Sequence, residues 1–170
     1  STAVITQVGA TPVFADVSPD RNIDPISIEK AVTDRTRAIL PVHLSGKCAD
    51  MTAIIEIAQR HELFVIEDAA QSVASTHAGR TAGAFGDVGC FSLHPLKNLN
   101  ARGDGGGMTT SDDELAGRLR LLRNHGIVDR DRVTEWGFNS RLDEVQAAIV
   151  NVKMLNLSKV IERRRAIADT

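Results

Sequence analysis

The sequence contains few of the residues that build disulfide or metal frameworks. Its 170 residues include two cysteines, Cys48 and Cys90, which lie far apart in a predicted loop and a predicted strand. A disulfide scaffold needs more cysteines at regular spacings, so we expect no disulfide. The five histidines do not recur at helical metal-ligand spacing and no Cys-x-x-Cys motif occurs, so we also expect no metal site.

Long apolar runs and a strong charge excess are missing too. No hydrophobic stretch approaches the length of a membrane-spanning helix, and residues 1–6 lack the basic flank that opens a signal peptide. The formal net charge of −2 argues against nucleic acid or an anionic membrane as the main partner. We therefore expect a cytoplasmic protein that binds neither.

The composition that is present is typical of a soluble domain. Apolar residues make up 42% of the chain and charged residues 25%, which is enough material for one core. Helical and strand patterns alternate along the sequence. This alternation predicts an α/β fold with a largely parallel sheet.

The expected elements follow from periodicity and from end signals. Short apolar runs predict strands at residues 13–17, 37–44, 63–66, 88–93 and 108–110. Helical spacing with N-terminal caps predicts helices from Asp24-Pro25 to 31, from Asp50 or Thr52 to 61, and from Asp112 or Asp113 to 122. Residues 140–168 have helical spacing and form one long helix or two.

Lys97 is the candidate for covalent chemistry. It lies in the loop between the apolar strand at 88–93 and the glycine-rich run at 103–107, whose spacing does not match a phosphate-binding loop. A lysine held on a short turn at the end of a buried strand is partly desolvated, which favours the neutral amine that attacks carbonyl groups. Such an amine forms Schiff bases. Taken alone, the residue is better interpreted as a solvated loop lysine.

Asp68 is the candidate partner of a cofactor ring. It falls at the carboxyl end of a predicted strand, the edge of an open α/β sheet where ligands bind. Pyridoxal 5'-phosphate needs a lysine that carries it as an imine and a carboxylate near its pyridine nitrogen. An aspartate after a strand is also a common turn cap, and strand alternation points the neighbouring Glu67 to the opposite side. The residues alone leave both interpretations open.

Three motifs in order make a family resemblance specific. Residues 67–72 (EDAAQS), 86–99 (GDVGCFSLHPLKNL) and 103–106 (GDGG) follow one another as in the DegT/DnrJ/EryC1/StrS aminotransferases. The likeness extends from residues 12–17 through 38–44 to 139–148. The sequence thus resembles a family of pyridoxal-phosphate enzymes that act on keto sugars. The resemblance implies the large domain of an aspartate aminotransferase-like, fold type I transferase, with a mostly parallel central sheet flanked by helices.

The resemblance also implies a role for each candidate residue. Lys97 would bind the cofactor covalently and move the proton during catalysis, and Asp68 would face the pyridine nitrogen. Gln71 would contact the cofactor ring or its phenolic oxygen, and Ser92 would contact its phosphate. Asn139 would reach across a homodimer interface to the phosphate in the neighbouring subunit, so that the two active sites are shared.

Simpler interpretations stay open for three of these residues. Gln71 would then be a loop amide, and Ser92 a buried serine bonded to its own backbone. Asn139 or Ser140 would cap the helix that follows.

Two stretches depart from the family pattern. Residues 73–75 (VAS) replace a stretch that commonly contains glycine, which we expect to alter packing beside Gln71. Ser45 stands where relatives often have an aromatic residue, which we expect to change the substrate pocket.

The resemblance implies an aminotransferase that moves an amino group from glutamate or glutamine to a keto sugar, which we expect to be nucleotide-linked. One alternative is another pyridoxal-phosphate enzyme, such as a lyase, decarboxylase or dehydratase. Family members that act as dehydratases have histidine at the lysine position, so Lys97 argues against that activity. A second alternative is a non-catalytic, sugar-binding regulator on the same fold.

The chain begins without methionine, and the resembled family has further sequence on both sides of the matched part. We therefore expect an internal fragment. Residues 1–150 would form part of the cofactor-binding large domain, and residues 151–170 would start the helix that leads to a small C-terminal domain. By itself the segment would retain the cofactor weakly and catalyse poorly.

Overall fold

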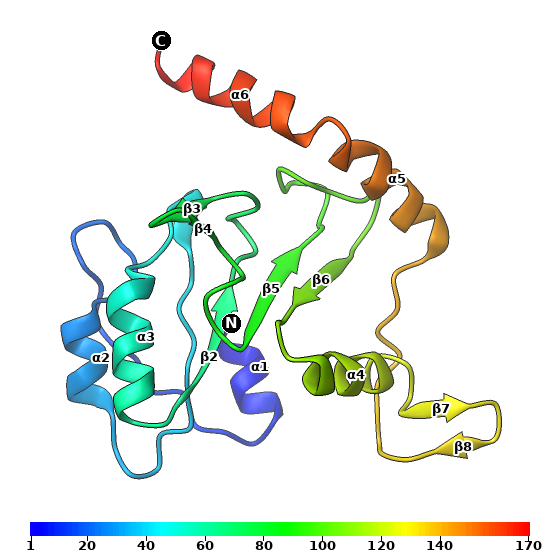
Figure 1. The fold of residues 1–170 in the computed structure, drawn as a ribbon, viewed down its shortest axis with the longest axis horizontal. Coiled ribbons are helices and arrows are strands. Elements are labelled where there is room, and N and C mark those ends of the chain that lie inside the picture. Colours follow the sequence, from blue (N-terminus) through cyan, green and yellow to red (C-terminus); the bar gives the residue numbers. More distant parts are fainter. The chain divides into compact units, whose positions relative to one another are not determined.

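The structure is a computed structural model that describes residues 1–170, in which the chain forms two compact units (Figure 1). The first unit comprises Ser1–Phe91 and Met108–Ala116, and the second comprises Ser92–Gly107 and Gly117–Thr170. Helices and strands alternate along most of the chain, as the sequence predicts.

A four-stranded sheet has the strand order β1-β2-β5-β6. Its strands are β1 (Ala38–Ile39), β2 (Phe64–Asp68), β5 (Val88–Ser92) and β6 (Gly106–Thr109). β2 pairs in parallel with both β1 and β5, and Asp68 at its carboxyl end lies opposite Cys90. The predicted α/β class, with a mostly parallel sheet flanked by helices, is confirmed.

Helices α2 (Pro25–Ala31) and α3 (Met51–Arg60) pack against each other in the first unit, and α3 packs on β2. Both begin at predicted caps. The Asp24 carboxylate accepts hydrogen bonds from two backbone N–H groups of the first turn, and Pro25 occupies the first helical position, where no N–H is needed. Asp50 Oδ1 accepts from the Ala53 N–H at 3.2 Å, so Asp50 rather than Thr52 caps α3.

The remaining elements are shorter or lie in the second half of the chain. The first unit also contains α1 (Thr2–Gln7), the 3-10 turn η1 (Leu44–Gly46), and a hairpin of β3 (Thr76–His77) and β4 (Arg80–Thr81). Helix α4 (Asp113–Leu122) begins in the first unit and continues into the second. The second unit contains the hairpin of β7 (Ile127–Asp129) and β8 (Arg132–Val133), followed by α5 (Glu144–Met154) and α6 (Leu157–Ala168).

The core of the first unit lies between α2, α3 and the strands β1 and β2. Its buried apolar side chains come from these elements and the residue before α3's cap: Ile28, Ile39, Ala49, Met51, Ile54, Ile57, Ala58 and Val65. Burying each of the larger ones contributes about 1.5–3 kcal/mol. This packing fixes β2, and with it the strand end that carries Asp68.

Three sequence predictions differ from the structure. The strand predicted at 13–17 is wrong, because only Val17 pairs, in an isolated bridge with Ile23, and Phe14 is exposed. The strand predicted at 37–44 is reduced to β1 and a bridge from Val42 to Asp68, since the chain turns into η1 at Leu44. For residues 140–168 the two-helix alternative is confirmed, but the first helix begins only at 144.

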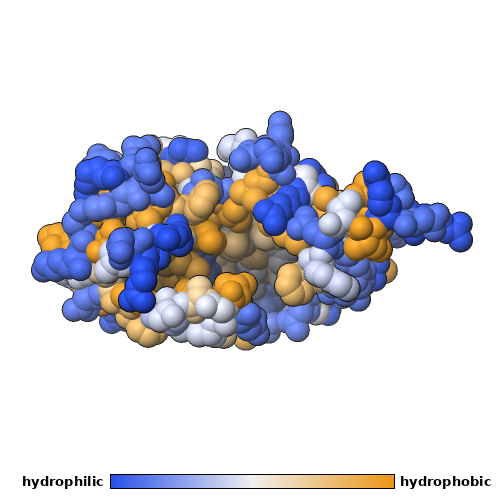
Figure 2. Space-filling model, turned by 90° about the horizontal axis from the view of Figure 1, so that it is seen from below, coloured by the Kyte–Doolittle hydropathy of each residue, from blue (hydrophilic) through white to orange (hydrophobic).

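Several large apolar side chains remain exposed. Val8 and Phe14 in the first unit are each 78% exposed, and in the second unit Trp136 is 97% and Leu155 84% exposed. Figure 2 shows apolar residues, in orange, among the hydrophilic ones on one face. Exposed apolar patches are typical of surfaces that contact another protein. No helix has both the length and the apolar character needed to cross a membrane.

The contact between β5 and the turn at Gly83 gives a test of this packing. A Cβ atom at Gly89 would lie 2.3 Å from the Gly83 Cα and 2.4 Å from its carbonyl oxygen, where only backbone movement could relieve the clash. We predict that Gly89→Ala lowers the free energy of unfolding by about 2–3 kcal/mol, measured by urea denaturation.

The matched control is Gly117→Ala in α4, where the added Cβ meets nothing within 4 Å. It should raise the free energy of unfolding by up to about 1 kcal/mol, because alanine is the better helix former. Unchanged stability of Gly89→Ala would contradict the close approach of the two glycines.

Candidate functional site

Asp68 is held by its backbone at the end of β2. Its N–H donates to the Pro41 carbonyl at 2.9 Å, and its own carbonyl accepts from the His43 N–H at 3.0 Å. These two bonds continue the pairing of β1 with β2 past the end of β1. Both backbone polar groups of Asp68 are therefore bonded to the segment that leads into η1, which fixes the position of its Cα.

The Asp68 carboxylate is half-buried and accepts one local and one long-range hydrogen bond. Oδ1 accepts from the Ala70 N–H at 3.1 Å, and Oδ2 accepts from the Ser1 hydroxyl. The turn-capping interpretation of Asp68 is thus observed, but it uses only part of the carboxylate, which has about four acceptor positions. Opposite Asp68, burial raises the pKa of the Cys90 thiol, and the charges of Asp68 and Glu67 raise it further.

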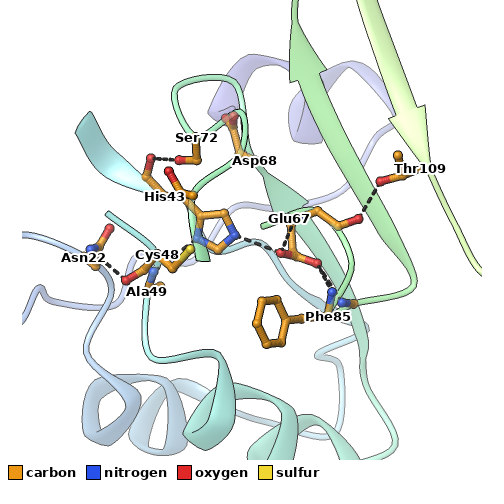
Figure 3. Close-up of polar contacts among 12 residues, drawn as sticks. Asn22, His43, Cys48, Ala49, Glu67, Asp68, Ser72, Phe85 and Thr109 are labelled. Carbon is orange, nitrogen blue, oxygen red and sulfur yellow. Dashed lines mark hydrogen bonds and ion pairs between the residues drawn. The ribbon is translucent and has the colours of Figure 1, made fainter. Parts of the chain in front are cut away.

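Glu67, the neighbour of Asp68, points the other way and is fully buried. Its carboxylate accepts four hydrogen bonds: from His43 Nε2 at 2.9 Å and from the backbone N–H groups of Gly83, Phe85 and Gly86 at 2.7 Å each (Figure 3). Burial opposes ionisation of this carboxyl, but the hydrogen bonds outweigh it and hold the pKa of Glu67 below its ordinary value. Glu67 is therefore a buried anion satisfied entirely by the protein.

His43 completes this buried network, and the sequence pattern predicts no role for it. Its ring is fully buried, and Nδ1 accepts from the Ala49 N–H at 3.2 Å, so that Nε2 carries the hydrogen donated to Glu67. Its carbonyl accepts from the Ser72 hydroxyl at 2.7 Å (Figure 3). The only signal for His43 in the sequence is an ionisable residue inside an apolar run, which by itself assigns no partner.

Gln71 lies in the same turn as Asp68, after β2. Its side-chain carbonyl accepts from the Ser45 N–H at 2.7 Å, and the side chain is exposed. This contact matches the loop-amide interpretation and leaves the Gln71 NH₂ group free to donate elsewhere. Ser45 and Ala74 both have positive φ, 53° and 61°, so the 73–75 stretch keeps at Ala74 a backbone conformation that favours glycine.

Ser92, the last residue of β5, and Lys97, in the loop that follows, both belong to the second unit. The loop is closed by hydrogen bonds from the Leu93 N–H to Gly105 and from the Ala101 N–H to Leu93, each 2.8 Å. The Lys97 N–H donates to His94 at 2.9 Å, which places the lysine at the end of a tight turn. Its side chain is half-buried, and Nζ takes part in none of the ion pairs in this structure.

Ser92 contacts the backbone of the same turn. Its Oγ accepts from the His94 N–H at 3.3 Å, as the backbone-bonded interpretation expects. Because the serine acts as acceptor there, its hydroxyl hydrogen stays available for an anionic group.

Asn139 lies in the segment that leads to α5. Its Oδ1 accepts from Arg141 Nε at 3.0 Å, and its backbone forms an isolated bridge with Asn124. The interpretation of Asn139 or Ser140 as a helix cap is wrong, because α5 begins at Glu144 with Asp143 as its N-cap. Helix α5 starts late because the backbone of Asn139 and Ser140 pairs with Asn124 and Arg123 instead of coiling.

The candidate residues thus form two groups. Asp68 and Gln71 belong to the turn after β2 in the first unit. Ser92 at the end of β5 and Lys97 in the loop after it belong to the second unit, as does Asn139 in the segment before α5.

The buried Glu67 network predicts a pH-dependent stability. We expect Glu67→Gln to lower the free energy of unfolding by about 3 kcal/mol at pH 7, because a neutral amide would turn an NH₂ group toward backbone donors. Since the folded pKa of Glu67 is depressed, its stabilisation is present above 4.5, the ordinary carboxyl value, and is lost as the pH falls below it.

Urea unfolding from pH 7 to pH 3 measures both effects, with exposed Glu56→Gln as the control. The difference between wild type and Glu67→Gln should shrink toward acid pH. A difference that stays constant with pH would contradict an ionised Glu67.

Comparison with known proteins places this chain in a family. It is 50% identical to a pleiotropic regulatory protein of Geobacillus stearothermophilus, over 98% of this chain and 45% of that protein. It is 47% identical to a dTDP-3-amino-3,4,6-trideoxy-alpha-D-glucose transaminase of Streptomyces venezuelae, over 96% of this chain and 44% of that one. The chain therefore spans a little under half the length of these curated relatives.

Solved structures of family members have the same fold as this chain. The crystal structure of DesV from S. venezuelae in complex with a ketimine intermediate matches with a TM-score of 0.95 and 46% identity, over 99% of this chain and 46% of DesV. Another solved relative contains bound pyridoxamine phosphate, and a further one is described in its pyridoxal-phosphate form. Pyridoxal phosphate is the cofactor of this family. The sequence model of the DegT/DnrJ/EryC1/StrS aminotransferase family matches residues 1–170. The chain belongs to the DegT/DnrJ/EryC1/StrS aminotransferase family.

Proposed function

We propose that this chain is the cofactor-binding core of a pyridoxal-phosphate-dependent aminotransferase that moves an amino group from glutamate or glutamine to a keto sugar. The nucleotide-linked sugar named for the S. venezuelae transaminase supports a nucleotide-linked substrate here. The observation that carries the proposal is the half-buried, unpaired amine of Lys97, in a chain that matches this family throughout.

The chemistry of the available groups fits pyridoxal 5'-phosphate. The Lys97 amine forms none of the ion pairs in this structure, and the Asp68 carboxylate keeps acceptor positions free beside its Ala70 and Ser1 contacts. Ser92 has a free hydroxyl hydrogen, and Gln71 a free NH₂ group. An amine, an anion and neutral donors are the groups that an aldehyde, a pyridinium and a phosphate require.

Each residue then has a defined task. When bound, the cofactor supplies an electron-withdrawing ring that stabilises negative charge on the carbon next to the transferred nitrogen. Lys97 would hold the cofactor through its amine and would then serve as the acid and base that moves the proton. Asp68 would keep the pyridine nitrogen protonated through a charge-assisted hydrogen bond, while Ser92 would donate to the phosphate and Gln71 would orient the ring.

The domain organisation is part of the same proposal. Residues 1–150 belong to the large, cofactor-binding domain, and residues 151–170 start the helix that leads to a small C-terminal domain. The relatives are more than twice as long as this chain, which leaves room for such a domain in the whole protein.

A homodimer with shared active sites is the proposed assembly. Asn139 follows two exposed aromatic residues, Trp136 at 97% and Phe138 at 69% exposure. Aromatic side chains are enriched in the buried centre of protein interfaces. We propose that this segment meets a second copy of the chain and that Asn139 contributes to the phosphate site there.

A second candidate function is a regulator that binds the sugar without catalysis. It is favoured by the name of the G. stearothermophilus relative, a pleiotropic regulatory protein. Transfer of the amino group separates the two functions, because a pure regulator would bind the sugar and leave glutamate unchanged.

The central test uses the full-length protein and the variants Lys97→Ala and Lys159→Ala. Borohydride should trap the cofactor on the Lys97 peptide of the wild type, and glutamate should bleach the cofactor's absorption band before keto sugars restore it. Lys97→Ala should lose trapping and at least about 10³-fold in the glutamate half-reaction. Lys159→Ala, an exposed lysine of α6, should match the wild type. Trapping on another lysine would refute the assignment.

A mixing experiment tests the shared sites. Lys97→Ala and Asn139→Ala subunits, each nearly inactive alone at limiting cofactor, are co-expressed with two different tags. If Asn139 serves the neighbouring subunit, each mixed dimer contains one intact site, and the statistical mixture recovers about a quarter of wild-type activity. Recovery of no activity in purified mixed dimers would mean that Asn139 acts within its own subunit.

A further inference from the structure

The loop that carries Lys97 has a second turn closed by a side chain. The Asn100 Nδ2 donates to the Lys97 carbonyl at 2.6 Å, three residues earlier. Together with the bond from the Lys97 N–H to His94, this contact holds both sides of the lysine's backbone. The peptide groups on either side of the reactive residue are thus fixed in the second unit itself.

The orientation of the Asn100 amide is set by Lys153 on α5. The Lys153 Nζ donates to the Asn100 carbonyl at 2.8 Å and to its Oδ1. An ammonium group only donates, so Oδ1 must face Lys153, and Nδ2 then faces the Lys97 carbonyl. Hydrogen bonds from a charged donor are stronger than neutral ones. Lys153 is half-buried and forms none of the ion pairs in this structure, so the hydrogen bonds of its ammonium group go to Asn100.

The same helix holds the loop at a second point. Gln146 Oε1 accepts from the Arg102 N–H at 2.7 Å. Gln146 and Lys153 are two helical turns apart, which places both on one face of α5. This face of α5 therefore forms hydrogen bonds with the loop just after Lys97, at Asn100 and at Arg102.

We propose that Asn100 and Lys153 are positioning residues for Lys97: the ammonium of Lys153 orients the Asn100 amide, which fixes the backbone that aims the reactive amine. This inference rests on the proposed function of Lys97. Asn100 and Lys153 lie outside the three motifs that identify the family. The inference gives helix α5, through Lys153, a role in positioning Lys97.

The test compares two cofactor forms and the cofactor-free protein. Pyridoxal phosphate needs the Lys97 amine for covalent attachment, whereas pyridoxamine phosphate does not. Asn100→Asp keeps the contact with Lys153 but removes the donor to Lys97, and Lys153→Met removes the ammonium with little change in volume. Lys153→Arg restores the charge, and Asn98→Asp, an exposed residue of the same loop, is the control.

In the full-length protein we expect Asn100→Asp and Lys153→Met to weaken pyridoxal phosphate binding about tenfold, the effect of one hydrogen bond. Pyridoxamine phosphate binding should change less than about twofold. In the cofactor-free protein, hydrogen exchange of the Lys97 and Ala101 amides should become about tenfold faster. Lys153→Arg should recover most of both effects, and Asn98→Asp should show neither.

Equal loss of both cofactor forms would overturn the proposal, because it would show general damage to the site. Unchanged pyridoxal phosphate binding together with unchanged exchange would overturn it as well. A wild type that binds neither form would refute the proposed function instead, and the exchange rates would still report whether Asn100 and Lys153 hold the loop.

Discussion

The buried carboxylate of Glu67 is the constraint on which the first unit depends. An isolated charge in the interior costs several kcal/mol, so it persists only where the protein supplies its donors. Here the donors are the His43 ring and three backbone N–H groups of the loop between Gly83 and Gly86. One anion therefore ties together the end of β2, the segment after β1 and the turn before β5.

The alternation of side chains along β2 separates two neighbouring carboxylates. Glu67 points into the interior and is satisfied there, whereas Asp68, the next residue, keeps free acceptor positions at the sheet edge. The His43 segment contributes to both, since its ring binds Glu67 and its N–H binds the Asp68 carbonyl. The buried Glu67 and its partners thus hold the strand end that carries the half-buried Asp68 carboxylate.

Local signals explain what the sequence predicts well. The starts of α2 and α3 follow from Asp24, Pro25 and Asp50, whose hydrogen bonds lie within three residues of each cap. Apolar runs locate β2 and β5, because strands buried in a parallel sheet are apolar on both faces. Lys97 and Asp68 were identified through a family motif, since neither residue alone distinguishes a cofactor site from a surface loop.

Non-local partners explain what the sequence does not predict. Residues 13–17 are apolar but form no strand, because strand formation depends on a neighbour that no local pattern reveals. The His43 to Glu67 bond spans 24 residues, and the Lys153 to Asn100 bond spans 53. Asn139 fails as a helix cap because residues before Asp143 pair with the Asn124 segment instead.

The central claim is that Glu67 stabilises the fold as a buried anion while Asp68 faces the cofactor ring. The protonation of that ring tests the claim most directly. The measurement is the ¹⁵N chemical shift of cofactor labelled at the pyridine nitrogen and bound to the full-length protein, in wild type and Asp68→Asn. The account predicts a protonated nitrogen in the wild type and an unprotonated one in Asp68→Asn. The same shift in both proteins would mean that another group faces the ring, and the account would be wrong.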